Sequence, residues 1–130
     1  MRLTLPWAVL AQANHRLMPR RGGKGLMLAP AYRRAKQDAE LLARAQVRGE
    51  PFDGPVSVVI DFFEPDRRRR DPSNLQKLIE DVLSGIAYED DSQIHELHWM
   101  RRGVDRPTPR AEIEVMAYLD RATLAPGEAR

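Results

Sequence analysis

The stretch from residue 67 to residue 91 holds the residues best suited to chemistry. It opens with four arginines and Asp71, and it closes on the adjacent carboxylates of Asp90 and Asp91. Guanidinium groups bind phosphate oxygens, and carboxylate oxygens are the ligands that Mg²⁺ prefers. Because both kinds of group flank one short segment, the sequence indicates chemistry on a phosphodiester.

An amphipathic helix is predicted between these two ends. Its buried stripe consists of apolar residues that recur at helical spacing, namely Leu75, Leu78, Ile79, Val82 and Leu83. On another face Asn74, Lys77 and Asp81 line up, because their spacing returns them to the same side of a helix. The predicted helix therefore carries polar groups suited to a site as well as a face for the core.

The segment after this helix decides whether the acids meet. A helix over residues 73–84 is about 18 Å long. If residues 85–91 run back nearly extended, they span about 23 Å and can bring Asp91 to face Asp71 at the helix N-terminus. If the segment curls up instead, the hypothesis of a metal site shared by Asp71 and Asp91 fails within one subunit.

The same residues also have purely structural interpretations. Asp71 followed by Pro72 is typical of a helix start, with Asp71 as the N-cap. Alternatively, Ser73 is the N-cap and Gln76 completes a capping box. Residues 90–92 can form a simple turn before a strand. The chemical interpretation gains weight because all of these features fall within one strand–helix–strand unit beside the arginines.

The composition fits one domain in a reducing compartment. The chain has 130 residues, so we expect a single domain over residues 1–130, with a frayed tail over residues 120–130. Cysteine is absent, which favours the cytoplasm and excludes disulfides and thiolate metal sites. No apolar run approaches the ~20 residues of a membrane span, so no membrane partner is expected. Pro6 interrupts the apolar run near the N-terminus, which argues against a secretory signal.

Positive charge is gathered in blocks, although the formal net charge is only +2. The blocks contain no acids and consist of Arg16, Arg20, Arg21, Lys24, and then Arg67, Arg68, Arg69 and Arg70. Such blocks suggest a polyanionic partner. The alternative for each block alone is a solvated, arginine-rich surface.

The remaining patterns predict an α+β fold, with a small mixed β-sheet and two main helices packed on it in a single domain. Residues 3–10 are expected to be an edge strand, because they contain Pro6, and residues 14–29 are expected to be irregular. A helix should begin at Pro30 and end at Gly49. The later strands are predicted over residues 56–63, central in the sheet, and over 94–102 and 111–118, joined as a hairpin.

A resemblance to the RusA family of Holliday-junction resolvases is carried by the pattern Asp71-x-x-Asn74-x-x-Lys77-x-x-x-Asp81, followed by Asp90-Asp91-x-x-Ile94. The likeness extends to Asn14-x-Arg16, the helix near Tyr32 and the strand before the arginines. It therefore covers most of the chain. The family usually has an aspartate two residues after the first, and this chain has Ser73 there.

This resemblance implies a homodimeric, Mg²⁺-dependent endonuclease that nicks four-way DNA junctions on two opposed strands. Mn²⁺ is a possible substitute for Mg²⁺, and no small-molecule cofactor is implied. Asp71, Lys77 and Asp91 would be catalytic, with Asp71 and Asp91 as metal ligands. Asp90 is the candidate to supply the metal charge that Ser73 lacks. DNA contacts would come from Asn74, Arg16, Lys24, Arg67, Arg68, Arg69 and Arg70.

Two other functions fit the same residues. The first is a protein of the same fold that binds branched DNA with weakened or lost catalysis, which Ser73 favours. The second is a metal-dependent nuclease that acts on flaps or other branched DNA. The sequence alone does not separate these from a junction resolvase.

Overall fold

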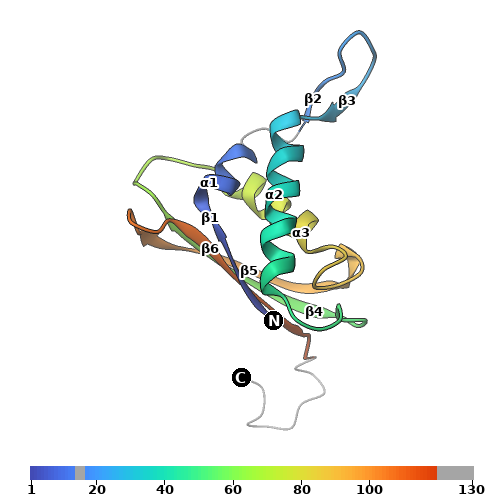
Figure 1. The fold of residues 1–130 in the computed structure, drawn as a ribbon, viewed down its shortest axis with the longest axis vertical. Helices are drawn as coiled ribbons and strands as arrows, with labels where there is room; N and C mark the ends of the chain where they lie inside the picture. Colours follow the sequence, from blue (N-terminus) through green and yellow to red (C-terminus); the bar gives the residue numbers. More distant parts are fainter. Residues whose placement is uncertain (14–16, 120–130) are drawn as a thin grey trace.

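A four-stranded mixed sheet carries one layer of helices on one of its faces (Figure 1). The computed structural model describes residues 1–13 and 17–119; the predicted DNA contact Arg16 and the predicted tail over 120–130 lie outside the described residues. The described elements are β1 (Arg2–Pro6), α1 (Trp7–Leu10), the 3₁₀ turn η1 (Ala11–Ala13), β2 (Leu17–Pro19), β3 (Leu26–Leu28), α2 (Pro30–Gln46), β4 (Val56–Glu64), α3 (Ser73–Leu83), the 3₁₀ turn η2 (Asp91–Gln93), β5 (Ile94–Val104) and β6 (Arg110–Ala117). The predicted α+β class is confirmed.

The strand order is β1-β6-β4-β5, so β4 is internal, as predicted. It pairs in parallel with β5 and antiparallel with β6, and β1 forms the other edge beside β6. Strands β4 and β5 are therefore joined by a crossover through α3, which lies on the helical face. Alternate residues of β4 point to that face and are buried, namely Val56, Val58, Ile60, Phe62 and Glu64.

The hairpin predicted between the last two strands is wrong. Strands β5 and β6 lie on opposite sides of β4, so the turn over residues 105–109 crosses the end of β4. Two inter-strand spacings amount to about 10 Å, which this turn can span. The backbone N–H of Asp105 donates to the carbonyl of Glu64 at 2.8 Å. A short linker usually joins neighbouring strands, but here the crossover through α3 has already placed β5 on one side of β4.

The first strand lies at the sheet edge, as predicted, but it is shorter than predicted. It ends at Pro6, and residues 7–10 form α1 instead of continuing the strand. Trp7 and Leu10 are both buried. Their spacing of three places them on one side of a helix but on opposite faces of a strand. Burial of both side chains therefore favours the helix.

The expectation of irregular structure over residues 14–29 is wrong for its described part. Strands β2 and β3 form a short antiparallel hairpin, in which Met18 is opposite Met27. Gly22 and Gly25 have φ of 69° and 89°, which glycine adopts readily in a tight turn. The hairpin projects beyond the N-terminal end of α2, away from the sheet (Figure 1). Its basic tip therefore stands clear of the core.

Helix α2 begins at Pro30, as predicted, but ends at Gln46 rather than near Gly49. The amide of Gln46 bonds both backbone groups of Thr4, accepting from its N–H at 2.7 Å and donating to its carbonyl at 2.8 Å. The last turn is thus tied to the edge strand β1. The buried side of α2 consists of Tyr32, Ala35, Ala39 and Ala43. Among the described helices, none is long and apolar enough to cross a membrane.

Candidate active site

Neither predicted N-cap is confirmed: the N-cap of α3 is Pro72, and Asp71 stands one residue before it. The Oδ1 of Asp71 accepts hydrogen bonds from the backbone N–H of Ser73 at 3.0 Å and from the Ser73 hydroxyl at 2.7 Å. These bonds stabilise the carboxylate and hold the pKa of Asp71 below its usual range. The helical path begins at Pro72, whose φ is −75° and ψ −6°. The alternative capping box is wrong, because Gln76 donates to Glu80 instead.

The ammonium group of Lys77 lies between two carboxylates. Its Nζ is 3.8 Å from Asp81 Oδ1, one turn further along α3, and 3.7 Å from Asp91 Oδ2. Asp81 is also held by Tyr32, whose hydroxyl donates to Oδ2 at 2.6 Å. Tyr32 is fully buried on α2. It therefore fixes Asp81 and, through Asp81, restricts the position of Lys77.

Of the two paths considered after α3, the extended return is not the one observed, yet Asp91 still reaches the helix. The chain turns at once over residues 84–88, where the N–H of Gly85 donates to the carbonyl of Tyr88 at 2.7 Å. The Tyr88 hydroxyl donates to the carbonyl of Glu80 at 2.9 Å. The turn forms because Ile86, Ala87 and Tyr88 bury their side chains against the core instead of running along the helix. Asp91 consequently lies beside Lys77, although the extended return to Asp71 does not form.

Asp90 has a structural role in this arrangement. Its Oδ2 accepts from the N–H of Ser92 at 3.1 Å, and Gln93 accepts from the N–H of Asp90 at 3.0 Å, which completes a capping box for η2. The bonds from Ser92 lower the pKa of Asp90. Gln93 also donates to the carbonyls of Phe52 and Gly54. The predicted turn over residues 90–92 is therefore confirmed, and it anchors the position of Asp91.

The donor chemistry near Lys77 fits a hard divalent cation. Asp81 and Asp91 already direct carboxylate oxygens at one positive group, the Lys77 ammonium. Asp71 stands six residues before Lys77, which corresponds to about 9 Å along a helix axis. Within residues 1–13 and 17–119, no three His, Cys, Asp or Glu side chains gather around a common point. Mg²⁺ nevertheless commonly takes only one or two carboxylates, with waters and substrate phosphate as the other ligands.

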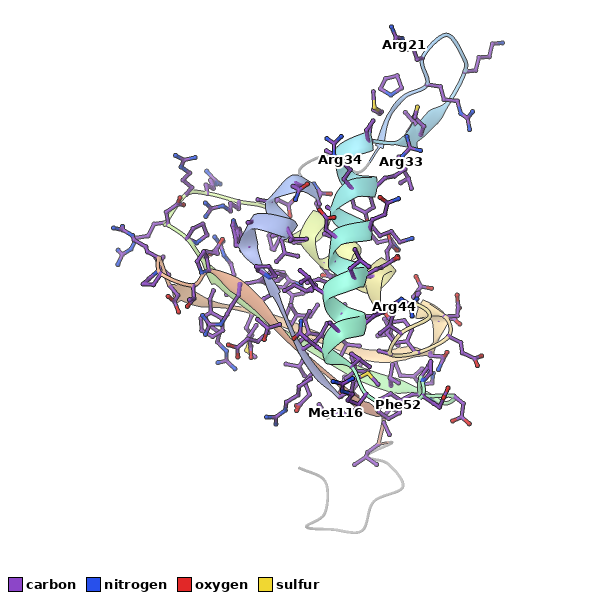
Figure 2. The ribbon with its side chains drawn as sticks, in the orientation of Figure 1. Arg21, Arg33, Arg34, Arg44, Phe52 and Met116 are labelled. Atoms are coloured by element: carbon purple, nitrogen blue, oxygen red, sulfur yellow. The ribbon has the colours of Figure 1, made fainter. Side chains whose placement is uncertain are left out.

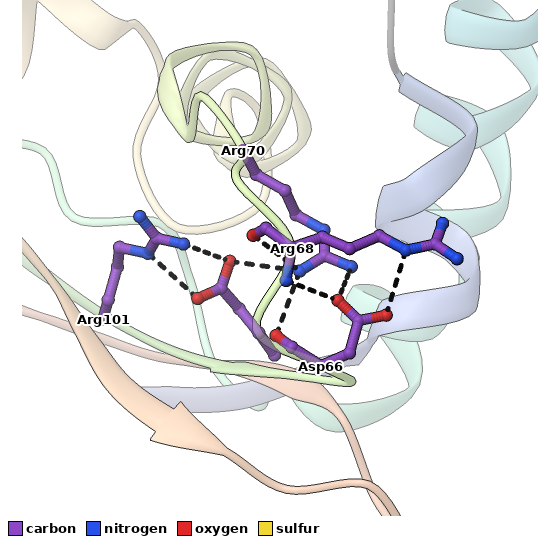
Figure 3. A network of polar contacts seen from close by, with 5 residues as sticks. Asp66, Arg68, Arg70 and Arg101 are labelled. Carbon is purple, nitrogen blue, oxygen red and sulfur yellow. Dashed lines mark hydrogen bonds and ion pairs between the residues drawn. The ribbon is translucent and has the colours of Figure 1, made fainter.

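A buried carboxylate, that of Glu64, holds the loop over residues 65–72, which carries the four arginines and is called the arginine loop below (Figure 3). Glu64, at the end of β4, is only 7% exposed. It accepts two hydrogen bonds from Arg101 on β5, both of 2.9 Å, and lies 3.6 Å from Arg70 Nη1. The hydrogen bonds and the charge of Glu64 raise the pKa of Arg101. Since a buried charge is stable only when it is paired, Glu64 gives the loop a fixed starting point.

Arg70 links the end of this loop to its beginning through hydrogen bonds to Asp66. Its Nη2 donates to Asp66 Oδ1 at 2.6 Å, and its Nη1 donates to the carbonyl of Asp66 at 3.2 Å. The guanidinium also lies 5.3 Å from the centroid of the Trp7 ring. The backbone N–H of Arg68, together with Arg70, lowers the pKa of Asp66. Arg70 thus holds the loop that leads to Asp71, whereas the other three arginines of the run are exposed.

A cleft of about 300 Å³ adjoins Asp71. Arg69 and Asn74 line it together with Asp71, and its apolar walls come from Trp7, Ala11, Ala13 and Leu75. A basic group, an amide and an acid are thus brought to one opening. Lys24, in contrast, lies in the tip of the β2–β3 hairpin, which projects away from the sheet (Figure 1).

Sequence reasoning missed two residues that support this site. Glu64 falls on the same face of β4 as Ile60 and Phe62, so strand alternation places a charged group on the buried side. That conflict is a signal for a paired carboxylate, and it was available in the sequence. Tyr32 looked only like a core residue, because nothing in the local pattern of α2 indicates that its hydroxyl meets Asp81.

Comparison with protein families gives a match over most of the chain. The family model described as "Endodeoxyribonuclease RusA" matches residues 6–116. The matched range includes the loop that carries the arginines, all of α3 and the η2 turn. It therefore contains Lys77 and the residues that hold it, Asp81, Asp91 and Tyr32. No curated protein matches the chain.

Proposed function

The chain belongs to the RusA endodeoxyribonuclease family, and from this premise we propose that it resolves four-way DNA junctions by paired nicks in a Mg²⁺-dependent reaction. The observation that carries the proposal is the position of Lys77. Its ammonium is held by carboxylates from two elements, and it is 39% exposed, so it can still meet a substrate. A fixed, accessible cation beside carboxylates suits phosphodiester cleavage, in which negative charge develops on the phosphoryl oxygens.

The residues have distinct parts in the proposed reaction. Lys77 would stabilise the charge on the phosphoryl oxygens, while Asp81 and Tyr32 keep its side chain in place. Asp91, beside Lys77, would hold Mg²⁺ with waters and substrate phosphate as its other ligands, and Asp71 is the second proposed ligand. When bound, the ion would polarise the scissile phosphate and lower the pKa of a bound water. The exposed arginines of the loop would bind neighbouring phosphates and so position the strand without reading its bases.

A homodimer would explain paired cleavage. A four-way junction has approximate two-fold symmetry, and a dimer with C₂ symmetry presents two equivalent sites to it. Each site would then nick one of two opposed strands. The residues proposed for one site all come from one subunit, so each subunit would supply a complete site.

The direct test is incubation of the protein with a labelled mobile four-way junction and with a duplex of equal length, with and without Mg²⁺. We expect symmetric nicks in the junction only, and only with the metal. Lys77→Met should lower the cleavage rate by about a hundredfold or more. The matched control is Lys36→Met, because Lys36 also pairs with an acid one turn further on and is 38% exposed. An equal effect of both substitutions would contradict the role of Lys77.

A second candidate function is binding of branched DNA without efficient cleavage. It is favoured by Ser73, whose hydroxyl bonds Asp71 Oδ1 at the position where the family usually has an acid. A hydroxyl contributes no charge to a metal site. Titration of Mg²⁺ against cleavage rate, for the native chain and for Ser73→Asp, separates the candidates. Activity only in the variant would favour the binding protein, and activity in both at a lower Mg²⁺ requirement for the variant would favour the nuclease.

A further inference from the structure

A second basic cleft lies at the end of the sheet, beside Arg67 at the start of the arginine run. It has a volume of about 620 Å³ and opens between that loop and the turn that joins β5 to β6. Its lining contains Phe63, Arg67, Arg102, Gly103, Val104, Asp105, Arg106 and Pro107. Three of these residues are arginines, and two of them belong to a part of the chain that the proposed function has not used.

The charges in this cleft are not balanced. Arg102 donates to Asp61 at 2.9 Å, and Asp105 accepts from Arg110 at 2.7 Å, so these two lining residues have partners. Arg67 and Arg106 are exposed, and the part of the chain that the structure describes offers neither of them an acid within ion-pair distance. The cleft therefore presents two uncompensated guanidinium groups from two separate segments.

The turn that carries Arg106 is firmly held. Asp105 accepts from the N–H of Thr108 at 3.2 Å and from its hydroxyl at 3.1 Å, and its own N–H donates to the carbonyl of Glu64. Arg110 packs over the ring of Phe63, with its guanidinium carbon 4.1 Å from the centroid. Little further ordering of the backbone is therefore needed before Arg106 binds a ligand, which lowers the entropic cost of binding.

We propose that this cleft binds the phosphodiester backbone of a DNA strand that continues from the active site, with Arg67 and Arg106 each contacting a phosphate. The proposal rests on the proposed function for the identity of the polyanion. Arg67 precedes Asp71 by four residues, which span at most about 14 Å of chain. One strand of B-form DNA presents about four phosphates over that length. A strand with its scissile phosphate beside Asp71 can thus reach the cleft within a few nucleotides.

The test is the salt dependence of junction binding, measured by fluorescence anisotropy without divalent metal so that no cleavage occurs. Loss of one phosphate contact lowers the slope of log K against log salt by about 0.9 and weakens binding about eightfold at 0.1 M salt. We expect this for Arg106→Ala, and wild-type behaviour for Arg106→Lys. The control is Arg44→Ala, because Arg44 is also exposed but lines a different cleft at the far end of α2 (Figure 2). If Arg106→Ala behaves like Arg44→Ala, the proposal is wrong.

A second measurement locates the contact on the DNA. Single phosphates of the cleaved strand are replaced in turn by neutral methylphosphonates, and each junction is tested with wild type and Arg106→Ala. At one linkage near the nick, the replacement should weaken wild type but not the variant. Additive losses at every linkage would overturn the proposal. A protein that shows the expected coupling but never cuts would support the cleft and contradict only the proposed activity.

Discussion

Replacing Glu64 by glutamine would remove the charge at the centre of the network that holds the arginine loop, with little change in volume. Glu64 is almost fully buried and accepts two hydrogen bonds from Arg101. Glutamine keeps one acceptor oxygen, but its amide group would face an arginine donor at the other position. Arg70 would lose an opposite charge 3.6 Å from its Nη1. The variant therefore leaves two guanidinium groups without the carboxylate that both of them face.

We expect this change to lower the free energy of unfolding by about 2 kcal/mol. Hydrogen bonds to charged groups contribute about 1.5–3 kcal/mol, and breaking a fully buried pair costs about 3–5 kcal/mol. The range for hydrogen bonds to charged groups applies rather than that for a fully buried pair, because the side chain of Arg101 is 41% exposed and water can solvate it. For a domain of this size, 2 kcal/mol corresponds to a fall of about 6–10 °C in Tm. The loop should also loosen, and single-turnover cleavage should slow about tenfold or more as Asp71 loses its fixed position.

Thermal unfolding, with hydrogen exchange of residues 65–72, measures both effects. The matched control is Asp61→Asn, because Asp61 is on the same strand and pairs with Arg102 through a single bond of 2.9 Å. That pair lies on the open face of the sheet, where exposed ion pairs contribute about 0.2–1 kcal/mol. Equal falls in Tm for the two variants, or unchanged exchange in the loop of Glu64→Gln, would refute the role assigned to Glu64.

Three further predictions concern other acids of the structure. Asp91→Asn should slow cleavage at least about a hundredfold while junction affinity stays equal or rises, because a carboxylate beside the bound phosphate is removed; normal turnover in a single-turnover assay would exclude Asp91 from the site. Tyr32→Phe should lower the free energy of unfolding in urea by about 1–2 kcal/mol, because Asp81 loses a hydrogen bond of 2.6 Å, and wild-type stability would show that this bond contributes nothing. Asp105→Asn should lower Tm at neutral pH, and the difference in Tm from wild type should shrink as pH falls below 3.8. The hydrogen bond from Arg110 lowers the pKa of Asp105 in the folded protein. The ionised carboxylate therefore stabilises the fold above the ordinary pKa, and this stabilisation is lost as pH falls through the lowered pKa of the folded state. A Tm difference that is the same at every pH would contradict that linkage.

The sequence predicted those parts of the fold that depend on local periodicity. The apolar spacing of Leu75, Leu78 and Val82 located α3 because a helix is the local structure that gathers those residues on one face. The apolar run of β4 likewise showed that this strand is central. These features depend on residues close together in the chain.

The parts that the sequence did not predict depend on competition between distant segments. The hairpin prediction for β5 and β6 failed because β5 pairs with β4 in parallel, a choice that the β5–β6 linker does not encode. The sequence left the path after α3 open, and the turned path forms because the side chains of Ile86 and Tyr88 are buried in the core, which the hydrophobic effect favours. The contact between Lys77 and Asp91 is a consequence of that burial, so it could not be predicted from the spacing of the two residues in the sequence.

The sheet order has a consequence for how the chain folds. Strand β1 pairs only with β6 in the described sheet, and the contact of Arg2 with Glu114 joins residues 112 positions apart. The unit from β4 through α3 to β5, in contrast, uses only residues 56–104 and contains Asp71, Lys77 and Asp91. Contacts of high sequence separation form late, because the chain must first lose the entropy of a long loop. The unit that carries the candidate site can therefore assemble while the antiparallel edge of β4 is still unpaired. Until β6 pairs with that edge, the nascent chain is exposed to aggregation through it.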